Sequence, residues 1–289
     1  MPYLARPDGA RIFYRLHGHG EPCLVMHGGL GLDHTCMWPF LNDLGTRFRL
    51  CYYDHRGNGR SSRNGADTMT YDDLLADADA LRADVLHAER TAVIASSYGG
   101  FVALQYALRY SERVSRLVLI GTAPTYGYFD EIRAAIRRRG GTKAQLEILA
   151  CEPEADDAWT SRKFLLLGRL YLRPAARPSL VQRVLGRTRW SGVAGRRGRE
   201  LSAAYDIRDR LSEICAPTLI AVGAHDFVTP PSQARLLRSA IPGSRLAIFE
   251  SGHFPHAEVP RAFSRVVRNW LDTDRRSRGR RGLQGGGRA

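Results

Sequence analysis

A short apolar segment that runs into two serines and two glycines restricts the fold of this chain more than any other feature. Residues 91–100 read T-A-V-I-A-S-S-Y-G-G, a pattern typical of a buried strand followed at once by a helix. Ala95 lies two residues before Ser97, and Gly99 lies two residues after it. Gly100 follows, so the backbone can turn sharply here without side-chain clashes. We therefore expect the Ser97 hydroxyl at the tip of a tight turn, where it can act as a nucleophile.

The neighbouring Ser96 fits the same turn less well. Counted from Ser96, the crowded positions fall on Ile94 and Tyr98, whose side chains would clash in a sharp turn. Ser97 is therefore the predicted nucleophile, and Ser96 is predicted to support it.

A serine nucleophile needs a base that takes its proton and an acid that orients the base. The segment Pro217–Gly223 reads as a buried strand that leads into Asp226. The segment Arg245–Glu250 reads as another strand and leads into His253. Each of the three residues thus follows the end of a strand, in the chain order serine, acid, histidine, and we expect Ser97, Asp226 and His253 to form a catalytic triad.

Other histidines and acids lie close to these positions and remain alternatives. His256 follows three residues after His253 and is expected to line the wall or to pack. Asp54 also follows a strand, but it opens the segment D-H-R-G-N-G-R-S, which reads as a loop-shaping element. His225 would point away from Asp226 if that segment is extended, so we expect it at the surface or behind the site.

The oxyanion that forms during acyl transfer needs backbone N–H donors that are already in place. The residue after the nucleophile, Tyr98, is predicted to supply one. The second should come from the loop H-G-G-L-G that follows an early strand, with Gly29 as the predicted donor and Leu30 as the alternative. Leu30 and His27 of this loop are also candidates for contact with substrate, although a role for His27 in bridging loops is the stronger interpretation.

These residues together resemble the α/β-hydrolase superfamily. H-G-G-L-G-L-D-H at His27–His34, D-H-R-G-N-G-R-S at Asp54–Ser61 and G-H-F-P-H-A-E-V-P at Gly252–Pro260 are most similar to its proline-iminopeptidase-like branch and related esterases. The chain departs from that branch at Leu30, where proline is usual, and at His55, where glutamine is usual. The resemblance implies the α/β-hydrolase fold and hydrolysis at a serine, with aminopeptidase as one possible activity.

Apolar runs alternate with helical patterns along most of the chain, as a mostly parallel sheet flanked by helices requires. Thr70 is the expected N-cap of one helix, with Asp73 in the capping-box position. The predicted strands are Arg11–His17, Pro22–His27, Arg49–Tyr53, Arg90–Ser96, Val114–Gly121, Pro217–Gly223 and Arg245–Glu250. The predicted helices are Thr35–Leu44, Tyr71–Leu86, Phe101–Tyr110, Ser232–Ala240 and Pro260–Leu271.

The alternation stops in the middle of the chain, which predicts an inserted helical cap over residues 125–210. The hydrolase core is then formed by residues 1–124 and 211–274, and an Arg/Gly-rich tail over 275–289 is predicted to be disordered. Trp159 and Phe164 are the cap residues that we expect to contact substrate, since small-molecule sites are mostly apolar.

Charge is concentrated in the cap and the tail. The chain has 43 basic and 29 acidic residues, of which 18 basic and 10 acidic lie in 125–210. The tail adds six basic residues, so the predicted core is electrically balanced. Almost all of the basic residues are arginines, which a genomic bias could produce, and nucleic-acid binding is therefore not predicted in spite of the basic pI.

Other features of composition point to a cytoplasmic enzyme that acts on a small molecule. No run of about 18 apolar residues occurs, so no membrane span is expected. The five cysteines show no metal-binding spacing, which favours a reducing compartment. The sequence leaves the oligomeric state open.

The predicted reaction is hydrolysis of an ester, lactone, thioester or amide of a small molecule through an acyl-enzyme. No metal or organic cofactor is expected, because a triad supplies nucleophile, base and electrostatic stabilisation. Two alternatives remain open: a proline-iminopeptidase-like aminopeptidase, and a non-hydrolytic biosynthetic enzyme or ligand-binding protein on the same fold.

Overall fold

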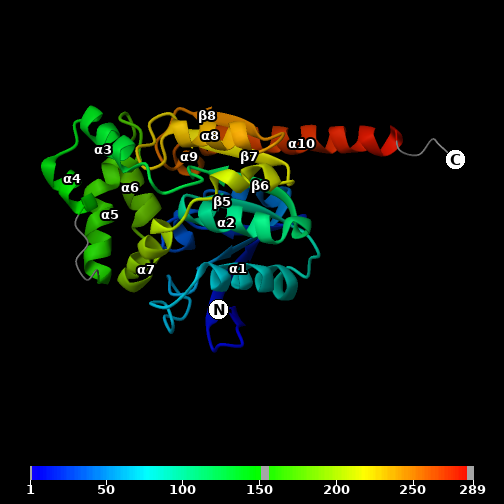
Figure 1. The fold of residues 1–289 in the computed structure, drawn as a ribbon, viewed down its shortest axis with the longest axis horizontal. Helices are drawn as coiled ribbons and strands as arrows, with labels where there is room; N and C mark the ends of the chain where they lie inside the picture. Colours follow the sequence, from blue (N-terminus) through cyan, green and yellow to red (C-terminus); the bar gives the residue numbers. More distant parts are fainter. Residues whose placement is uncertain (1, 151–155, 285–289) are drawn as a thin grey trace.

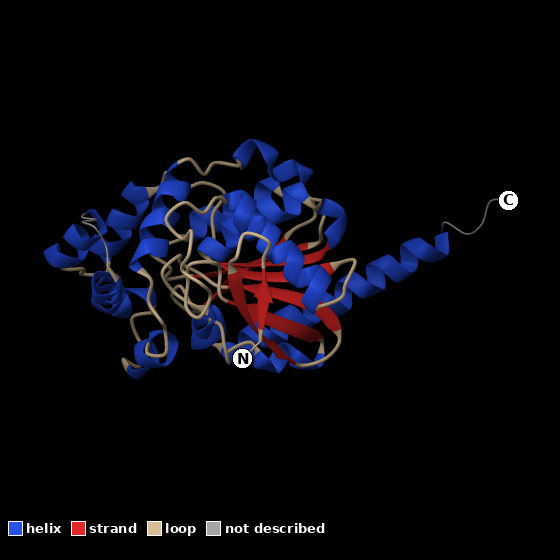
Figure 2. Cartoon of the chain, turned by 90° about the horizontal axis from the view of Figure 1, so that it is seen from below, coloured by secondary structure: helices blue, strands red, loops and turns tan. Residues whose placement is uncertain are grey.

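A twisted sheet with helices on both faces forms the body of the molecule (Figures 1 and 2). The computed structural model describes residues 2–150 and 156–284. Within them the sheet has the strand order β1-β2-β4-β3-β5-β6-β7-β8. The strands are β1 (Tyr3–Ala5), β2 (Arg11–His17), β3 (Glu21–Met26), β4 (Phe48–Tyr53), β5 (Thr91–Ser96), β6 (Val114–Ile120), β7 (Thr218–Gly223) and β8 (Arg245–Phe249).

The sheet is antiparallel at one end and parallel in the rest. β1, β2 and β4 pair antiparallel, whereas all pairs from β4 through β3 to β8 are parallel. The central strands are buried on both faces, and β5 and β7 are buried at every residue. Their continuous apolar runs are the reason, because both faces lie under helices. The predicted α/β-hydrolase architecture is confirmed, and only the short edge strand β1 was not predicted.

The helices cover the sheet and build a second layer at one end. Figure 1 shows α3 to α7 gathered at the end opposite to the one from which α10 projects. The helices are α1 (Tyr71–Ala80), α2 (Tyr98–Arg109), α3 (Phe129–Arg138), α4 (Lys143–Ala150), α5 (Asp157–Tyr171), α6 (Ser179–Leu185), α7 (Gly192–Ala203), α8 (Pro231–Ala240), α9 (Pro255–Glu258) and α10 (Pro260–Gln284).

Shorter helical turns complete the elements. They are η1 (His34–Cys36), η2 (Asn42–Thr46), η3 (Leu81–Val85), η4 (Ser111–Arg113) and η5 (Arg208–Glu213). The predicted capping box is present, since the Thr70 hydroxyl accepts the Asp73 N–H and the Asp73 carboxylate accepts the Thr70 N–H.

Two predicted segments differ in the structure. The helix expected over Thr35–Leu44 is wrong, because only the turns η1 and η2 form there. Pro39 lies between them, and proline both lacks an N–H and disfavours a helical residue before it. The tail differs too: α10 continues to Gln284 where disorder is predicted over 275–289, and residues 285–289 lie outside the described residues. Arginine is a good helix former, so local propensity permits this extension.

The five helices α3 to α7 lie between β6 and β7, within the range where the sequence predicts the cap. The ends of this range touch each other through an isolated bridge between Thr125 and Asp206. The division into core and cap stays a prediction. We refer to residues 125–210 as the cap. None of the described helices is both long and apolar enough to cross a lipid bilayer.

Candidate active site

The turn between β5 and α2 holds Ser97 in a backbone conformation that few residues adopt. Ser97 has φ 53° and ψ −120°, and α2 begins at the next residue. A serine keeps such a conformation only where its surroundings impose it, and such strain gathers at functional sites. A side chain at Gly99 would clash with the Met26 carbonyl, and one at Gly100 would clash with Thr122. The glycines thus let the turn pack closely against the sheet.

The two serines of this turn face different surroundings. Ser97 lines a cavity of about 590 Å³, whereas Ser96 is buried with 2% of its surface exposed. Only Ser97 of the two can meet a substrate in this cavity.

An acid and a base meet at the ends of β7 and β8. The His253 Nδ1–H donates to Asp226 Oδ2 at 2.8 Å, with both side chains buried. Asp226 Oδ1 accepts the N–H groups of Val228 and Thr229, at 2.9 and 3.0 Å. The Thr229 hydroxyl donates to Oδ2 at 2.7 Å. Because Nδ1 carries the proton, His253 Nε2 is left as the acceptor that a general base needs.

Strand order brings this acid–base pair next to the serine turn. β5 pairs with β6, and the Ser97 N–H donates to the Ile120 carbonyl at 2.9 Å. Gly121, which follows β6 with φ 50°, lies below the pair: a Cβ there would come within 3.0 Å of Asp226 Oδ2 and 3.2 Å of His253 Nδ1. His253 and Ser97 line the same cavity. The structure therefore gathers all three predicted triad residues at one edge of the sheet.

The predicted oxyanion donors border the cavity on its core side. Tyr98 starts α2, so its N–H belongs to the first helical turn and has no intrahelical acceptor. Gly29 lies in the loop after β3, lines the cavity and has φ 57°. Leu30, the alternative donor, lines the cavity as well. Ser97, Tyr98 and Gly29 thus share one wall, as an oxyanion site requires.

His27 does not line the cavity, so the prediction that it contacts substrate disagrees with the structure. It is fully buried, its Nε2 accepts the His55 N–H at 3.0 Å, and its Nδ1–H donates to the Gly28 carbonyl at 3.0 Å. In a trans peptide the N–H points opposite to the C=O. By holding the Gly28 carbonyl inward, His27 directs the Gly29 N–H away from the interior. The bridging role that the sequence favoured for His27 agrees with these contacts.

Residues of the cap also line the cavity, which is mostly apolar. Trp159 and Phe164 line it, as predicted from their aromatic character. Sequence reasoning did not single out the cationic residues that also line it, Arg133, Lys163 and Arg199. Lys163 follows Trp159 by four residues, so helical spacing could have placed both on one face.

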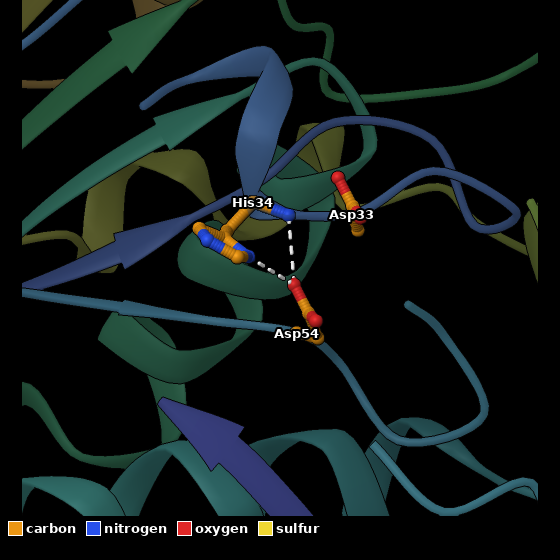
Figure 3. A group of neighbouring side chains, drawn as sticks. All are labelled: Asp33, His34 and Asp54. Atoms are coloured by element: carbon orange, nitrogen blue, oxygen red, sulfur yellow. Dashed lines mark hydrogen bonds and ion pairs between the residues drawn. The ribbon is translucent and has the colours of Figure 1, made fainter. Parts of the chain in front are cut away.

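The remaining acids and histidines named from the sequence have other partners. Asp54 Oδ1 accepts the N–H and the Nδ1–H of His34, at 2.8 and 2.6 Å (Figure 3). Asp54 Oδ2 accepts the Arg60 N–H at 2.8 Å. Asp54 therefore braces two loops, in line with a loop-shaping segment. His256 is buried, and its Nε2–H donates to the Cys36 carbonyl at 3.1 Å, as expected for a histidine that packs in the interior. His225 Nε2 contacts Glu250 at 2.6 Å, at the surface.

Asp33, His34 and Asp54 have ligand atoms within 4.8 Å of one another, close enough to consider a metal ion (Figure 3). Their atoms are already engaged. His34 Nδ1 is a donor to Asp54, and Asp33 accepts the Thr35 N–H at 2.9 Å and the Arg60 guanidinium at 3.2 Å. A metal would have to displace these bonds, so we assign the group to loop bracing.

Comparison with known proteins identifies the family. A family model described as alpha/beta hydrolase fold matches residues 22–260. The chain belongs to the α/β-hydrolase fold family. Proline iminopeptidase PfmaB of Pestalotiopsis fici is 27% identical over 92% of this chain and 97% of its own length. The chain is therefore a hydrolase of this fold.

Solved structures of other α/β-hydrolases resemble it over their full length. A hydrolase from Pseudomonas aeruginosa PA01 has a TM-score of 0.72 and 29% identity, covering 93% of this chain and 97% of that one. The enol-lactonase from Burkholderia xenovorans LB400 has a TM-score of 0.68 and 25% identity, covering 94% of this chain and 100% of that one.

In this α/β-hydrolase the end of cap helix α5 is hydrogen-bonded to the loop that carries His253. The His253 N–H donates to the Tyr171 carbonyl at 2.6 Å, and the Tyr171 ring lies 5.7 Å from the His253 ring. Glu258 accepts the Gly252 N–H at 2.7 Å and the Arg173 N–H at 2.8 Å. Arg139 adds a bond to the His225 carbonyl at 3.1 Å, next to Asp226. These hydrogen bonds connect the cap to the two loops that hold His253 and Asp226.

Three buried histidines of this α/β-hydrolase should make its stability depend on pH. Burial lowers the pKa of His256 to about 4 and lowers the pKa values of His27 and His55. In the unfolded chain a histidine binds its proton below about pH 6.5. The unfolded state therefore binds more protons as pH falls from about 6.5 to about 4, and the free energy of unfolding should decrease over that window.

For His256 alone the loss by pH 4 is on the order of 3 kcal/mol. Urea unfolding at several pH values between 7 and 4 measures it. His256→Gln should weaken the pH dependence of the free energy of unfolding, whereas His19→Gln, at an exposed position, should leave that dependence unaltered. A stability that stays constant from about pH 6.5 to 4.5 would contradict the expectation.

Proposed function

We propose that this α/β-hydrolase cleaves a small ester or lactone through an acyl-enzyme on Ser97. The observation that carries the proposal is that a strained Ser97 and His253 line one cavity, with His253 hydrogen-bonded to Asp226. His253 Nε2 takes the Ser97 proton as the hydroxyl attacks the carbonyl, and Asp226 stabilises the imidazolium that forms. The N–H groups of Gly29 and Tyr98 hold the oxyanion.

The remaining steps of the reaction use the same groups. His253 gives its proton to the leaving alcohol, which departs and leaves an acyl ester on Ser97. A water molecule then enters, His253 takes its proton, and the hydroxide attacks the acyl carbon. This second tetrahedral intermediate then collapses, the bond between the acyl carbon and Ser97 Oγ breaks, and His253 returns its proton to Ser97 Oγ as the carboxylic acid is released. The groups of this chain suffice for each of these proton transfers.

Substrate class is supported by relatives and by charge. The solved enol-lactonase that the chain resembles acts on a lactone, and the relative PfmaB is named a proline iminopeptidase. An aminopeptidase binds a substrate with a free ammonium group, and such a cation is disfavoured under a cap with 18 basic and 10 acidic residues. We therefore favour the ester or lactone over the aminopeptidase, which is the second candidate.

A direct comparison of two substrates tests this preference. We expect para-nitrophenyl butanoate to be hydrolysed with a higher kcat/KM than proline para-nitroanilide. Lower ionic strength should widen the difference, since the repulsion between cap and ammonium is screened less. Measuring kcat/KM for both substrates at two salt concentrations tests the preference and its dependence on salt. A clear preference for the anilide would restore the aminopeptidase as the first candidate.

A further inference from the structure

Glu258 of α9 does not line the cavity, yet it is hydrogen-bonded to the residue that precedes the proposed base. We propose that Glu258 is a positioning residue for the reaction, whose carboxylate fixes the loop of His253 between core and cap and so directs the imidazole toward Ser97. The inference rests on the proposed function, because His253 is taken to be the base. It adds a residue outside the triad on which turnover depends.

The two carboxylate oxygens of Glu258 bind two different segments. Oε1 accepts the Gly252 N–H at 2.7 Å, and Oε2 accepts the Arg173 N–H at 2.8 Å. Gly252 belongs to the loop after β8, whereas Arg173 lies two residues after α5 in the cap. A carboxylate accepts at both oxygens at once, and hydrogen bonds to a charged acceptor are about twice as strong as neutral ones. One side chain therefore holds the base loop and the cap together.

The base loop packs directly against the backbone of the cap. A side chain at Gly252 would clash with the Tyr171 carbonyl oxygen and with Leu172. The N–H of the next residue, His253, donates to the same Tyr171 carbonyl at 2.6 Å. Glu258 and this carbonyl thus fix the two peptide groups that lead into His253. Because each peptide group is planar, they restrict where the His253 side chain begins.

The same segment of the cap is also bound to the loop of the acid. The Arg139 guanidinium donates to the Leu172 carbonyl at 2.5 Å and to the His225 carbonyl at 3.1 Å. His225 immediately precedes Asp226, whose carboxylate accepts the His253 Nδ1–H at 2.8 Å. Acid, base and this cap segment therefore form one connected set of hydrogen bonds. A displacement of about 1 Å within such a set can lower a rate about a hundredfold.

The folded surroundings do not favour the charge of Glu258. Burial raises the pKa of this carboxyl group, although the backbone N–H groups that it accepts act in the opposite direction. A carboxyl group with a raised pKa binds its proton more tightly in the folded than in the unfolded chain, so its ionisation opposes folding at neutral pH. Loss of the charge should therefore cost little stability, and an effect on turnover can be separated from an effect on folding.

A purely structural role for Glu258 makes a different prediction. It predicts a lower Tm in a variant, with kcat and KM of the folded enzyme unchanged. A positioning role predicts a lower kcat at an unchanged KM, because the substrate still binds in the cavity while the base is misplaced.

Glu258→Gln tests the proposal, because the amide keeps the size of the side chain but accepts at only one of its two ends. With para-nitrophenyl butanoate we expect kcat to fall about ten- to a hundredfold, at a KM within about threefold of the parent. The proton resonance of the His253 Nδ1–H should shift upfield, since its bond to Asp226 lengthens when the base moves. This spectroscopic measurement needs no substrate. Thermal unfolding shows whether the variant is folded.

Two other glutamates provide matched controls. Glu21, with 19% of its side chain exposed, accepts the Arg116 guanidinium at 2.6 Å at the start of β3. Glu131 joins α3 of the cap to α8 of the core through Ser232 at 2.5 Å and Gln233 at 3.2 Å, rather than to the base loop. Glu21→Gln and Glu131→Gln should each keep kcat within about threefold of the parent, whatever their effect on Tm.

An unchanged kcat or an unshifted His253 resonance in Glu258→Gln would overturn the proposal. An equal loss of kcat in Glu131→Gln would overturn it too, since any bond between cap and core would then have the effect. Glu258→Asp keeps the charge but shortens the reach, and it replaces the Gln variant if that one does not fold. If neither variant folds, Glu258 is required for folding and the proposal is refuted.

Failure of the proposed function gives a different result from failure of this inference. If the acyl-enzyme is wrong, ester hydrolysis survives in Ser97→Ala, and the His253 resonance of Glu258→Gln can still be compared with that of the parent. If only the role of Glu258 is wrong, Ser97→Ala is inactive while Glu258→Gln keeps its kcat.

Discussion

Replacement of Ser97 by alanine should abolish labelling by a fluorophosphonate and lower kcat on an ester by about 10⁴-fold or more. The hydroxyl is the atom that forms the acyl bond in the proposed reaction, and no other side chain can replace it. The residual rate should reflect only binding and oxyanion stabilisation. Gel fluorescence with the probe measures labelling, and initial rates on para-nitrophenyl butanoate measure turnover.

Ser96 provides the matched control for this experiment, since it is the adjacent residue of the same type. It is buried below the turn with 2% exposure, so Ser96→Ala should keep labelling and leave kcat within a few-fold of the parent. Labelling that survives in the Ser97 variant and disappears in the Ser96 variant would reverse the assignment of the nucleophile.

Asp226→Asn should lower kcat by about 10³- to 10⁴-fold while KM changes little. The amide keeps the shape of the carboxylate but removes its charge and can donate a proton toward His253 Nδ1. His253 would then hold its proton on Nε2, the wrong nitrogen for a base. Steady-state kinetics on the same ester separates kcat from KM. The thermal midpoint checks that the variant is folded.

Two other aspartates show whether the effect is specific. Asp130 on α3 is fully exposed, so Asp130→Asn should behave as the parent. Asp54→Asn should mainly lower Tm, because Asp54 accepts the N–H groups of His34 and Arg60 in the loops beside the cavity. Near-parent activity of Asp226→Asn, together with a large loss of kcat in Asp54→Asn at unchanged Tm, would move the orienting acid to Asp54.

Strands were predicted more accurately than the loops between them. β7 and β8 begin and end within one residue of the expected bounds, because each is a short apolar run whose signal is local, although only β7 is buried along its whole length. The segment 35–44, which lies between two predicted strands, was predicted as a helix, and there Pro39 prevents a continuous helix.

The cap shows where local pattern stops being informative. Trp159 and Phe164 line the cavity as predicted, and so do the aromatic residues Tyr126 and Phe129, whereas Trp190 does not. An aromatic on a small helix can face a cavity or the interior of its own layer, and the sequence period does not distinguish the two faces.

The sequence by itself determined seven of the eight strands of the sheet, the family, and the positions of Ser97, Asp226 and His253 at strand ends. These depend on local turn chemistry and on chain order, which a sequence states directly. Only the tertiary structure decided that His27 faces inward, that Glu258 joins the His253 loop to the cap, and that Arg199 of α7 lies over the Trp159 ring of α5. Each of these contacts joins segments whose relative position depends on packing of the whole chain, so no local pattern could contain it.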